Sequence, residues 1–429
     1  MADQSRTQTL PKTLTDLMFA MADRAKMGAE ALRLAGQEVR TQAILESAKA
    51  IRARATEILS ANDADQASAR DKGLTDAMIE RLILNPARVE AMARGLEEVA
   101  NLPDPVGREL ARWTRPNGLD IARVSTPIGV IAIIYESRPN VTADAAALCI
   151  RSSNAAILRT GSEALNSALA IYAAFEDGLR AAGLPDCCVQ LVPTSDRDAV
   201  GLILGGLGGA INLIIPRGGK SLVARVQAEA RAPVLAHLEG LNHTYVHSAA
   251  DPDKAVAVTV NAKMRRVSVC GATETLLIDQ AVAADLLPKI ADALVARGCE
   301  LRGDDAAQAI YPMTAATQDD WKTEYLLPIL AVKVVDGLDD AIAHIRTYGS
   351  GHTEAIITED AKAAEAFLNE VDSAIVIWNA STQYADGGEF GLGAEIGIST
   401  DRLHARGPVG AEQLTTFKYV VRGEGQTRP

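Results

Sequence analysis

The sequence has 429 residues, 48% of them hydrophobic and 23% charged, which is enough for two or three domains with buried cores. Its formal net charge of −12 argues against a nucleic-acid partner, because phosphate binding needs a basic face. No stretch approaches the ~20 apolar residues of a membrane span, and charges interrupt the apolar run at the N-terminus, which excludes an ordinary signal peptide. Five cysteines without paired metal spacing indicate free thiols in a reducing compartment, so we expect a cytoplasmic protein.

The N-terminal region has a helical pattern. Apolar residues recur at helical spacing over residues 14–62, which predicts two helices, and again over about 75–99. Asn117-Gly118 then lies between two strand-like runs within residues 111–124, and this dipeptide favours the tight turn of a hairpin.

From Val130 onwards, short apolar runs alternate with helical patterns. The predicted strands are Val130–Tyr135, Ala155–Leu158, Val189–Val192, Ile211–Ile215 and Val234–Leu238. The predicted helices between them are 141–151, 163–182, 196–204 and 219–230. Such alternation predicts a parallel sheet with both faces covered, and sheets of this kind bind ligands at the carboxyl ends of their strands.

A second α/β unit begins near His243. Its predicted strands are Thr244–His247, Thr275–Ile278, Val332–Val335, Ala355–Ile357 and Ala374–Ile377, with helices at 251–263 and 282–297. The last predicted strand, Leu414–Arg422, has no helix after it and needs a sheet to join, for which a neighbouring subunit is one candidate.

Cys270 is the residue that says most about chemistry. Gly271 follows it, and Lys263, Arg265 and Arg266 precede it closely. Positive charge near a thiol favours the nucleophilic thiolate, and a following glycine leaves room for a substrate. A structural cysteine packed as a small hydrophobe is the alternative, and this segment alone does not exclude it.

Several residues are candidates for cofactor or anion binding. The glycine fingerprint of an ordinary dinucleotide fold is absent after the first strand of the sheet. Gly218, Gly219 and Lys220 nevertheless lie between a strand and a helix, where backbone N–H groups favour an anion, although a plain β–α turn fits equally well. Arg159 ends the second strand and is either a solvated side chain or a partner for the 2′-phosphate of NADP.

An asparagine, a glutamate and several histidines can also be read either as structural residues or as functional ones. Asn140 can cap the next helix or donate its amide to an oxyanion. Glu239 is a candidate general base or a loop charge. His237, His243 and His247 lie close in sequence, as do His344 and His352, but neither spacing fits a common metal site, so we expect no metal.

Taken together, these segments resemble the aldehyde dehydrogenase superfamily and, within it, the family of gamma-glutamyl phosphate reductases. The resemblance runs over nearly the whole chain. The segments that carry it are Tyr135-Glu-Ser-Arg-Pro-Asn140, Ile214-Ile-Pro-Arg-Gly-Gly219, Val260-Asn-Ala-Lys263 leading to Cys270, Asp340-Ala-Ile-Ala-His-Ile-Arg346, Gly351-His-Thr-Glu354, and Gly387 to Pro408 followed by Leu414-Thr-Thr-Phe-Lys418.

The resemblance implies an aldehyde dehydrogenase-like α/β fold, with two parallel-sheet domains and an arm of β-strands that joins subunits into a homo-oligomer. An NADP-binding domain would occupy residues 1–242, with 111–124 contributing to the arm. A catalytic domain carrying Cys270 would occupy 243–380, residues 381–413 would return to the cofactor domain, and 414–429 would complete the arm.

The resemblance also implies roles for individual residues. Cys270 would be the nucleophile, Asn140 the oxyanion donor and Glu324 a ligand of the nicotinamide ribose. The residues that would bind NADPH are Arg159, Gly218, Gly219 and Lys220. A substrate with a carboxylate and a phosphate needs cations, and the candidates are Arg138, Arg265, Arg266 and Arg406.

Three positions depart from the family pattern. Thr160-Gly161-Ser162 stands where the reductases often have Gly-Gly-Lys, which removes a lysine from the expected phosphate site. Val267 replaces a proline before the cysteine, and Glu239 lies where many of these reductases have glycine.

The implied reaction is the NADPH-dependent reduction of L-glutamate 5-phosphate to L-glutamate 5-semialdehyde and phosphate, a step of proline biosynthesis, through a thioester on Cys270. Glutamate 5-kinase, which would make the unstable substrate, is a further candidate partner. One alternative is an aldehyde dehydrogenase of other specificity that oxidises an aldehyde with Glu239 as base. Another is a non-redox cysteine acyltransferase or an inactive scaffold. Only the reductase, run backwards, needs phosphate.

Overall fold

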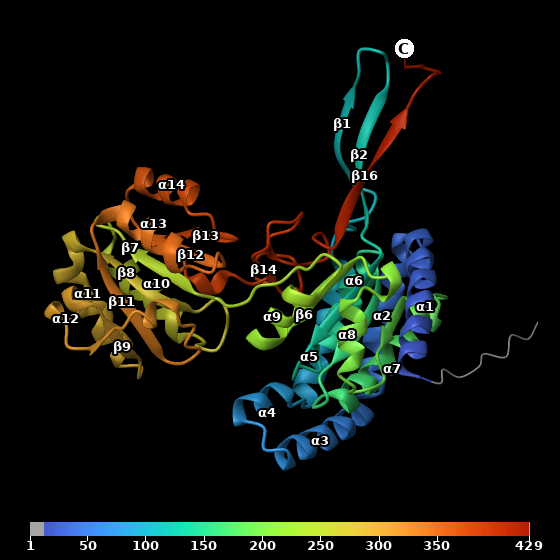
Figure 1. The fold of residues 1–429 in the computed structure, drawn as a ribbon, viewed down its shortest axis with the longest axis horizontal. Coiled ribbons are helices and arrows are strands. Elements are labelled where there is room, and N and C mark those ends of the chain that lie inside the picture. Colours follow the sequence, from blue (N-terminus) through green and yellow to red (C-terminus); the bar gives the residue numbers. More distant parts are fainter. Residues whose placement is uncertain (1–12, 429) are drawn as a thin grey trace, which may run out of the picture. The chain divides into compact units, whose positions relative to one another are not determined.

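A computed structural model describes residues 13–428 and divides the chain into two compact units (Figure 1). Unit 1 consists of the described residues up to Leu235, of Leu392–Gly397 and of the described residues from Val409 onwards. Unit 2 consists of Ala236–Gly391 and Ile398–Pro408. The sequence placed these boundaries at 242 and 380. The observed boundaries differ from these because the chain crosses between the units twice more. Backbone hydrogen bonds join Ile396 and Gly397 to Val409 in unit 1, while the Thr400 N–H donates to the Ala236 carbonyl in unit 2.

The N-terminal part of unit 1 is helical. Its helices are α1 (Leu14–Leu34), α2 (Gln37–Ala53), α3 (Ala55–Asp71), α4 (Asp76–Leu82) and α5 (Pro86–Asn101). The sequence predicted two helices over residues 14–62, whereas the structure has three there. The prediction was wrong because Arg54, between α2 and α3, leaves helical geometry with ψ 13° although neither proline nor glycine is present.

The central sheet of unit 1 is parallel, with the order β5-β4-β3-β6. Its strands are β3 (Val130–Tyr135), β4 (Ala155–Thr160), β5 (Val189–Leu191) and β6 (Leu213–Arg217). Its helices are α6 (Val141–Arg151), α7 (Leu165–Ala181), α8 (Asp198–Leu204) and α9 (Lys220–Glu229), with 3-10 turns η1 (Asp186–Cys188) and η2 (Leu207–Gly209). The fifth predicted strand, Val234–Leu238, was wrong, because within it only Val234 forms a single parallel bridge, to Ile214.

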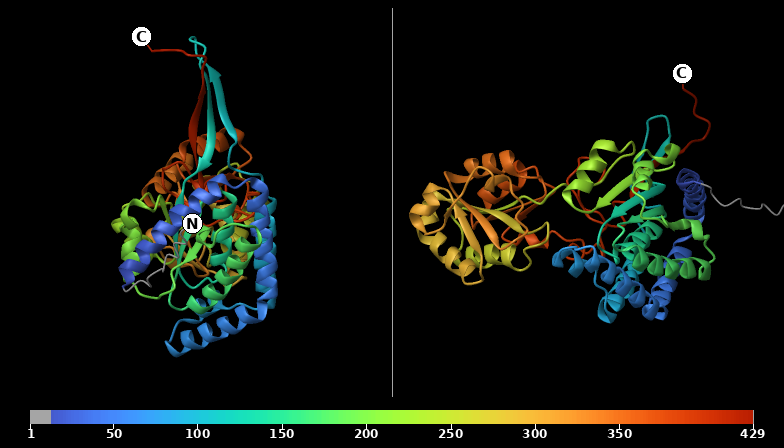
Figure 2. Two further views of the ribbon diagram at one scale, coloured as in Figure 1. Left: turned by 90° about the vertical axis from the view of Figure 1, so that its right-hand side faces the viewer. Right: turned by 60° about the horizontal axis from the view of Figure 1, so that its bottom comes forward.

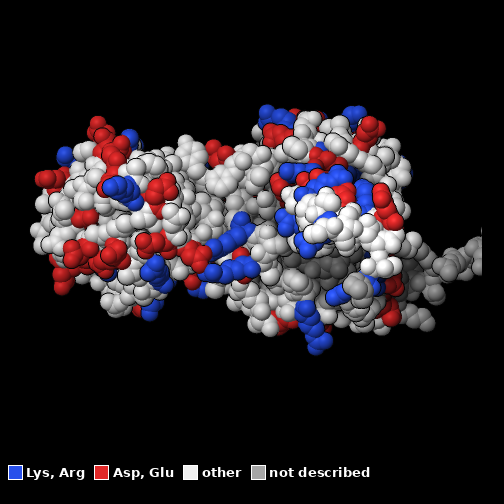
Figure 3. Space-filling model, turned by 90° about the horizontal axis from the view of Figure 1, so that it is seen from above, with Lys and Arg blue, Asp and Glu red and all other residues white. Residues whose placement is uncertain are grey.

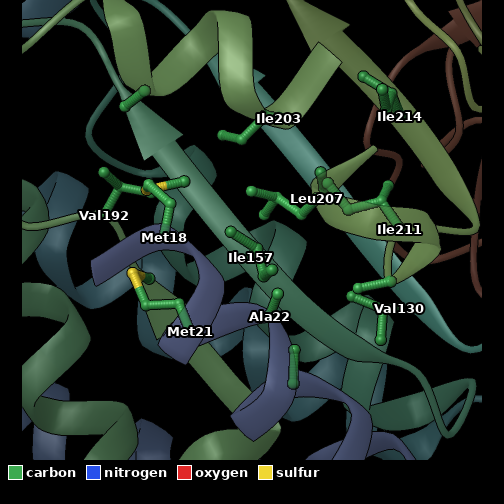
Figure 4. Close-up of a cluster of buried hydrophobic side chains, with 14 of the residues drawn as sticks. Met18, Met21, Ala22, Val130, Ile157, Val192, Ile203, Leu207, Ile211 and Ile214 are labelled. Atoms are coloured by element: carbon green, nitrogen blue, oxygen red, sulfur yellow. The ribbon is translucent and has the colours of Figure 1, made fainter. Parts of the chain in front are cut away.

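Helices cover both faces of this sheet, as strand–helix alternation predicts. Alternate residues of β3, such as Val130, pack with Ile157 of β4 against Met18 and Met21 of α1 and Ile203 of α8 (Figure 4). Helices α6 and α7 pack on the opposite face, and α2 packs on α7.

A separate antiparallel sheet forms an arm on unit 1 (Figures 1 and 2). The hairpin of β1 (Glu109–Thr114) and β2 (Asp120–Pro127) is confirmed, and β16 (Thr415–Arg422) pairs with the other edge of β2 along its whole length. The last strand therefore joins a sheet of its own chain. Aromatic side chains lie on the surface of the arm, with Trp113 39% and Tyr419 57% exposed.

Unit 2 is built on a seven-stranded parallel sheet in the order β10-β9-β11-β8-β7-β12-β13. Its strands are β7 (Asn242–Val246), β8 (Thr273–Asp279), β9 (Glu300–Gly303), β10 (Thr314–Ala315), β11 (Ile329–Val335), β12 (Thr353–Ile357) and β13 (Ile375–Trp378). Its helices are α10 (Pro252–Met264), α11 (Gln280–Val295), α12 (Asp305–Ile310), α13 (Gly337–Tyr348) and α14 (Ala361–Glu370), with η3 (Asp320–Lys322), η4 (Thr382–Tyr384) and the short pair β14 (Ile398–Ser399) and β15 (Gly407–Pro408).

Two apolar clusters show that this second sheet is also covered on both faces. One packs α10 and α11 against residues such as Leu276 and Val332, and the other packs α13 and α14 against Tyr245 and Leu277. Within residues 13–428, no helix has both the length and the apolar character needed to cross a membrane. On the face drawn in Figure 3, acidic and basic side chains are interspersed on each unit.

Candidate active site

The amino ends of neighbouring strands bring the candidate catalytic residues of unit 2 together. Cys270 comes shortly before β8, Gly240 shortly before β7 and His352 directly before β12. These three strands are adjacent and parallel in the sheet, so the segments that precede them meet at one edge. The carboxyl-end expectation concerned the first sheet, whereas Cys270 lies at the amino ends of strands in the second sheet.

Asn242 fixes the turn that carries Cys270. Its Nδ2 donates to the backbone carbonyls of Cys270 at 2.6 Å and Ala272 at 2.9 Å, and its Oδ1 accepts from the Thr353 N–H at 3.1 Å. The side chain is fully buried. An amide that is buried with these groups paired holds the turn in one conformation, because any movement would leave polar groups unsatisfied.

Gly240 brings Glu324 to the same turn. A Cβ at Gly240 would lie 2.1 Å from the Cys270 carbonyl oxygen, so only glycine permits this approach. The Gly240 N–H donates to Oε1 of Glu324 at 2.9 Å. The half-buried Glu324 thus belongs to the network around Cys270, and its role toward a nicotinamide ribose stays a prediction.

Gln383 of η4 holds the chain on the other side of the cysteine turn. Its Nε2 donates to the carbonyl of Ala262 at 2.9 Å and lies 3.3 Å from those of Asn261 and Arg266. These carbonyls are at the end of α10, where a helix leaves its last acceptors without helical partners. The exposed Arg265 donates to Oε1 of Gln383 at 3.4 Å, so this predicted substrate residue lies beside the turn.

Lys263 does not provide the uncompensated positive charge that its position in the sequence suggested. Its Nζ lies 2.5 Å from Oε2 of Glu274, and both side chains are buried. Burial raises the pKa of Glu274 to about 7 in spite of the neighbouring ammonium. The cations left near the thiol in sequence are the exposed Arg265 and Arg266.

Exposure distinguishes Cys270 from the other four cysteines. Cys270 is half-exposed, whereas the other four are buried. Burial raises the pKa of Cys149 and Cys188 to about 12 and of Cys299 to about 11, and also raises that of Cys187. Those four thiols stay protonated at neutral pH, which leaves Cys270 as the candidate nucleophile.

Two histidines lie beside the thiol. A ring nitrogen of His237, a ring nitrogen of His352 and the Cys270 sulfur all lie within 4.8 Å of one another. Burial, together with the neighbouring His237, lowers the pKa of His352 to about 3. The sequence grouped His237 with His243 instead, but His243 is buried and paired with Glu354 at 2.9 Å.

The cofactor candidates of unit 1 lie at the carboxyl ends of β4 and β6. Arg159 is the last residue but one of β4 and is 7% exposed; its terminal nitrogen donates to the Ser195 carbonyl at 3.2 Å, while its buried Nε has no hydrogen-bond partner among the described residues. Burial lowers the pKa of Arg159, and the carboxylates of Glu163 and Glu136 oppose that shift. An orphaned guanidinium N–H fits an anionic ligand such as a 2′-phosphate.

The carboxylate of Glu136 lies at the N-terminus of α9. Its Oε2 accepts from the Gly219 N–H at 3.0 Å, and a Cβ at Gly218 would lie 2.4 Å from the same oxygen. The backbone donor that the sequence assigned to a cofactor phosphate is thus directed at a carboxylate of the chain. Lys220 is the exposed first residue of α9.

Asn140 does not cap α6 with its side chain. Its Nδ2 donates instead to Oδ2 of Asp144 at 2.9 Å, and burial raises the pKa of Asp144 to about 6. The capping interpretation was therefore wrong, while the oxyanion role stays a prediction. Arg138 lies half-buried in the loop just before Asn140.

Arg406 is a substrate candidate that lies beside the segment of His352. A Cβ at Gly351, next to His352, would be 3.7 Å from its guanidinium. Arg406 also pairs with the Asp372 carboxylate at 2.6 Å and donates to the Asp372 carbonyl at 3.0 Å, which holds the pKa of Asp372 below its usual value. A substrate anion would have to share this arginine with Asp372.

Comparison with known proteins places this arrangement in a family. The model of the aldehyde dehydrogenase family matches residues 2–320. A gamma-glutamyl phosphate reductase of Caulobacter vibrioides is 70% identical over 413 residues, which cover 96% of this chain and 100% of that protein. The crystal structure of gamma-glutamyl phosphate reductase from Thermotoga maritima matches with a TM-score of 0.93 at 44% identity, over 96% of this chain and 100% of that one.

The chain belongs to the aldehyde dehydrogenase family, among its gamma-glutamyl phosphate reductases. The predicted aldehyde dehydrogenase-like fold is thereby confirmed. Members of this family are oxidoreductases that use nicotinamide cofactors. Among these reductases, the protein of Rhodospirillum rubrum is 59% identical over 100% of both chains.

The sequence did not connect several residues with Cys270. Asn242 and Gln383 act on segments far away along the chain, so no local spacing marks them. His352 was considered with His344 as a possible metal ligand, but not as a neighbour of the cysteine. Glu163, whose carboxylate accepts from the Ser137 N–H at 2.6 Å, follows Arg159 in the segment where the family pattern is broken. The departure from the family pattern at Thr160-Gly161-Ser162 could therefore have drawn attention to Glu163.

Proposed function

We propose that this chain catalyses the NADPH-dependent reduction of L-glutamate 5-phosphate to L-glutamate 5-semialdehyde and phosphate, in proline biosynthesis. The observation that carries the proposal is a half-exposed Cys270 in a rigid turn, in a chain 70% identical over its length to a gamma-glutamyl phosphate reductase.

Cys270 supplies the covalent step. Its thiolate attacks the acyl carbon, the carbon–oxygen bond to phosphate breaks, and phosphate leaves with the electron pair, without a strong general acid. The substrate acyl group then remains on the sulfur as a thioester, and a bound nicotinamide supplies the hydride for that carbon. Expulsion of the thiolate releases the aldehyde, so one difficult step becomes two easier ones.

The oxyanion formed in each step needs donors. The Cys270 backbone N–H is one, because the turn that Asn242 fixes also fixes this group. A donor of this kind is typically worth about 3–4 kcal/mol in the transition state. The amide of Asn140 keeps its proposed role as a second donor.

NADP is the proposed cofactor because of Arg159. A buried guanidinium with an orphaned N–H suits a 2′-phosphate. Glu163 opposes this choice, since a carboxylate in that region suits the ribose hydroxyls of NAD. Gly218, Gly219 and Glu324 remain proposed cofactor contacts, with Lys220 as a second cation.

The substrate anions are assigned to arginines. Arg265 and Arg406 are the stronger candidates, because contacts within unit 2 place them beside the segments of Cys270 and His352. Arg138 and Arg266 remain secondary candidates.

The deciding experiment runs the reaction backwards. Absorbance at the nicotinamide band is followed with semialdehyde, NADP⁺ and phosphate, each omitted in turn, and we expect activity only when all are present. Cys270→Ala should abolish turnover, whereas Cys299→Ala, a change to a buried cysteine of the same unit, should not. Phosphate-independent oxidation that Glu239→Gln removes would instead establish the alternative aldehyde dehydrogenase.

A homo-oligomer joined through the arm is also proposed. Strands β1 and β16 form the two edges of the arm sheet, and exposed Trp113 and Tyr419 pack edge-on with ring centroids 6.2 Å apart. Aromatic side chains and unpaired strand edges are features of subunit contacts. Analytical ultracentrifugation tests whether the arm joins subunits: Tyr419→Lys should lower the assembled fraction, and a monomeric wild-type protein would exclude this role of the arm.

The compartment is proposed from the cysteines. Buried free thiols fit a reducing compartment, and we place the enzyme in the cytoplasm.

A further inference from the structure

The nucleophile of unit 2 shares its surroundings with two side chains that the proposed reaction does not use. His237 precedes β7, His352 precedes β12, and the ligand-type atoms of both lie within 4.8 Å of the Cys270 sulfur and of each other. A thiol and two imidazoles are the ligands that Zn²⁺ prefers.

The spacing is close to that of a zinc site. With Zn–N bonds of about 2.0–2.1 Å and a Zn–S bond of about 2.3 Å, tetrahedral ligands lie about 3.5 Å apart. The three ligand atoms all lie within 4.8 Å of one another, so no separation exceeds this spacing by more than about 1.3 Å. Small rotations of Cys270 and His237, which are half-exposed, would close that difference around an ion.

Both imidazoles are already oriented by their other nitrogen. His237 Nδ1 lies 2.7 Å from the Ile398 carbonyl oxygen, and His352 Nδ1 lies 2.8 Å from the Thr353 hydroxyl. Metal-ligating histidines have this arrangement, because a hydrogen bond at one nitrogen fixes the ring and leaves the other nitrogen for the metal.

His352 provides the independent observation. Its side chain is fully buried, and its Nε2 has no hydrogen-bond partner in the described part of the chain. A buried polar atom without a partner costs free energy, which a ligand at that atom would recover.

We propose that His237, Cys270 and His352 form a site for a borderline-soft divalent cation, Zn²⁺ first, with water in the fourth position. Binding releases the thiol proton to solvent and forms a Zn–S bond. The sulfur is then no longer available to an acyl carbon, so zinc reversibly inhibits the enzyme. The binding itself does not depend on the proposed reaction.

The test uses the full-length, reduced, metal-free protein. Zn²⁺ is titrated in competition with a chromogenic chelator, and Co²⁺ is used to detect a thiolate-to-metal absorption band. We expect one ion per chain, and an affinity that falls by about 100-fold or more in Cys270→Ser and in His352→Gln. The matched controls His247→Ala and Cys299→Ala should bind zinc as the wild type does.

A second readout is alkylation of Cys270, which needs no turnover. Stoichiometric Zn²⁺ should protect the thiol, and a chelator should restore its reactivity. The proposal is overturned if the wild-type protein takes up no zinc, or if Cys270→Ser and His352→Gln bind it with unchanged affinity. Thermal denaturation checks that His352→Gln is folded; if it is not, the half-exposed His237→Ala takes its place, and retention of wild-type affinity there overturns the site.

Discussion

Replacing Asn242 with alanine should loosen the turn that carries the nucleophile. The change removes three hydrogen bonds, to the carbonyls of Cys270 and Ala272 and from the N–H of Thr353. Each is worth about 1 kcal/mol net, so the local cost is about 3 kcal/mol, or roughly a hundredfold in the opening equilibrium. The fully buried site offers little access for water to replace them.

Hydrogen exchange followed by mass spectrometry measures this cost in peptides from β7 and β8. Turnover should fall through kcat more than through KM, because the substrate arginines are untouched while the sulfur and its oxyanion donor are displaced. Asn242→Asp keeps the shape but loses both donors, and should behave similarly.

Asn62 of α3 is a matched control. It is equally buried, donates to the Leu82 carbonyl at 2.9 Å and to the Ser167 hydroxyl at 3.0 Å, and accepts from the Leu84 N–H at 2.7 Å. Asn62→Ala should destabilise unit 1 by a comparable amount without changing exchange in β7 and β8. The reasoning is refuted if Asn242→Ala leaves exchange there within about 0.5 kcal/mol of the wild type and turnover unaltered.

Three further predictions concern charge and exposure. Iodoacetamide should label Cys270 in the folded protein and the other four cysteines only after unfolding, because burial raises the pKa of all four. At a pKa of about 12, as for Cys149, a thiol is roughly 10⁻⁵ ionised at pH 7, and peptide mapping that finds early labelling elsewhere contradicts this. Since the folded protein holds the Glu274 proton more tightly than the unfolded chain, this carboxyl stabilises the fold fully below about pH 4.5. That contribution, on the order of 3 kcal/mol, is lost as the pH rises through about 7. Urea denaturation at pH 5 and 8 should show that dependence in the wild type and not in Glu274→Gln. Arg159→Ala should raise KM for NADPH about 10-fold or more above its effect on NADH, and equal losses would remove its role toward the 2′-phosphate.

Local pattern was sufficient for much of the fold. The bounds of β3 and α6 were predicted as the structure has them, because a run of buried apolar residues is followed by a clear helical pattern. Strand β9 was missed because Glu300 and Arg302 give it a polar character. Arg302 is accommodated there by an ion pair with Glu300, two residues away, and by one with Asp320 that only the folded chain brings within reach.

Of the candidate site, the sequence predicted the residues whose chemistry is visible in their own short segment. Cys270 and Glu324 were singled out, and the structure connects them through Gly240. Asn242 was not, and His352 was considered only beside His344, because the relation of both residues to the cysteine depends on β8, β7 and β12 being neighbours in the sheet. That order is a property of the topology, which residue spacing does not contain.

The arm has a consequence for how the protein is made. Strand β2 ends at Pro127 and its partner β16 begins at Thr415, so about 290 residues must be translated between them, which takes about 15–60 s at ~5–20 residues per second. Throughout that interval one edge of β2 is open to pairing with other nascent chains on the same polysome.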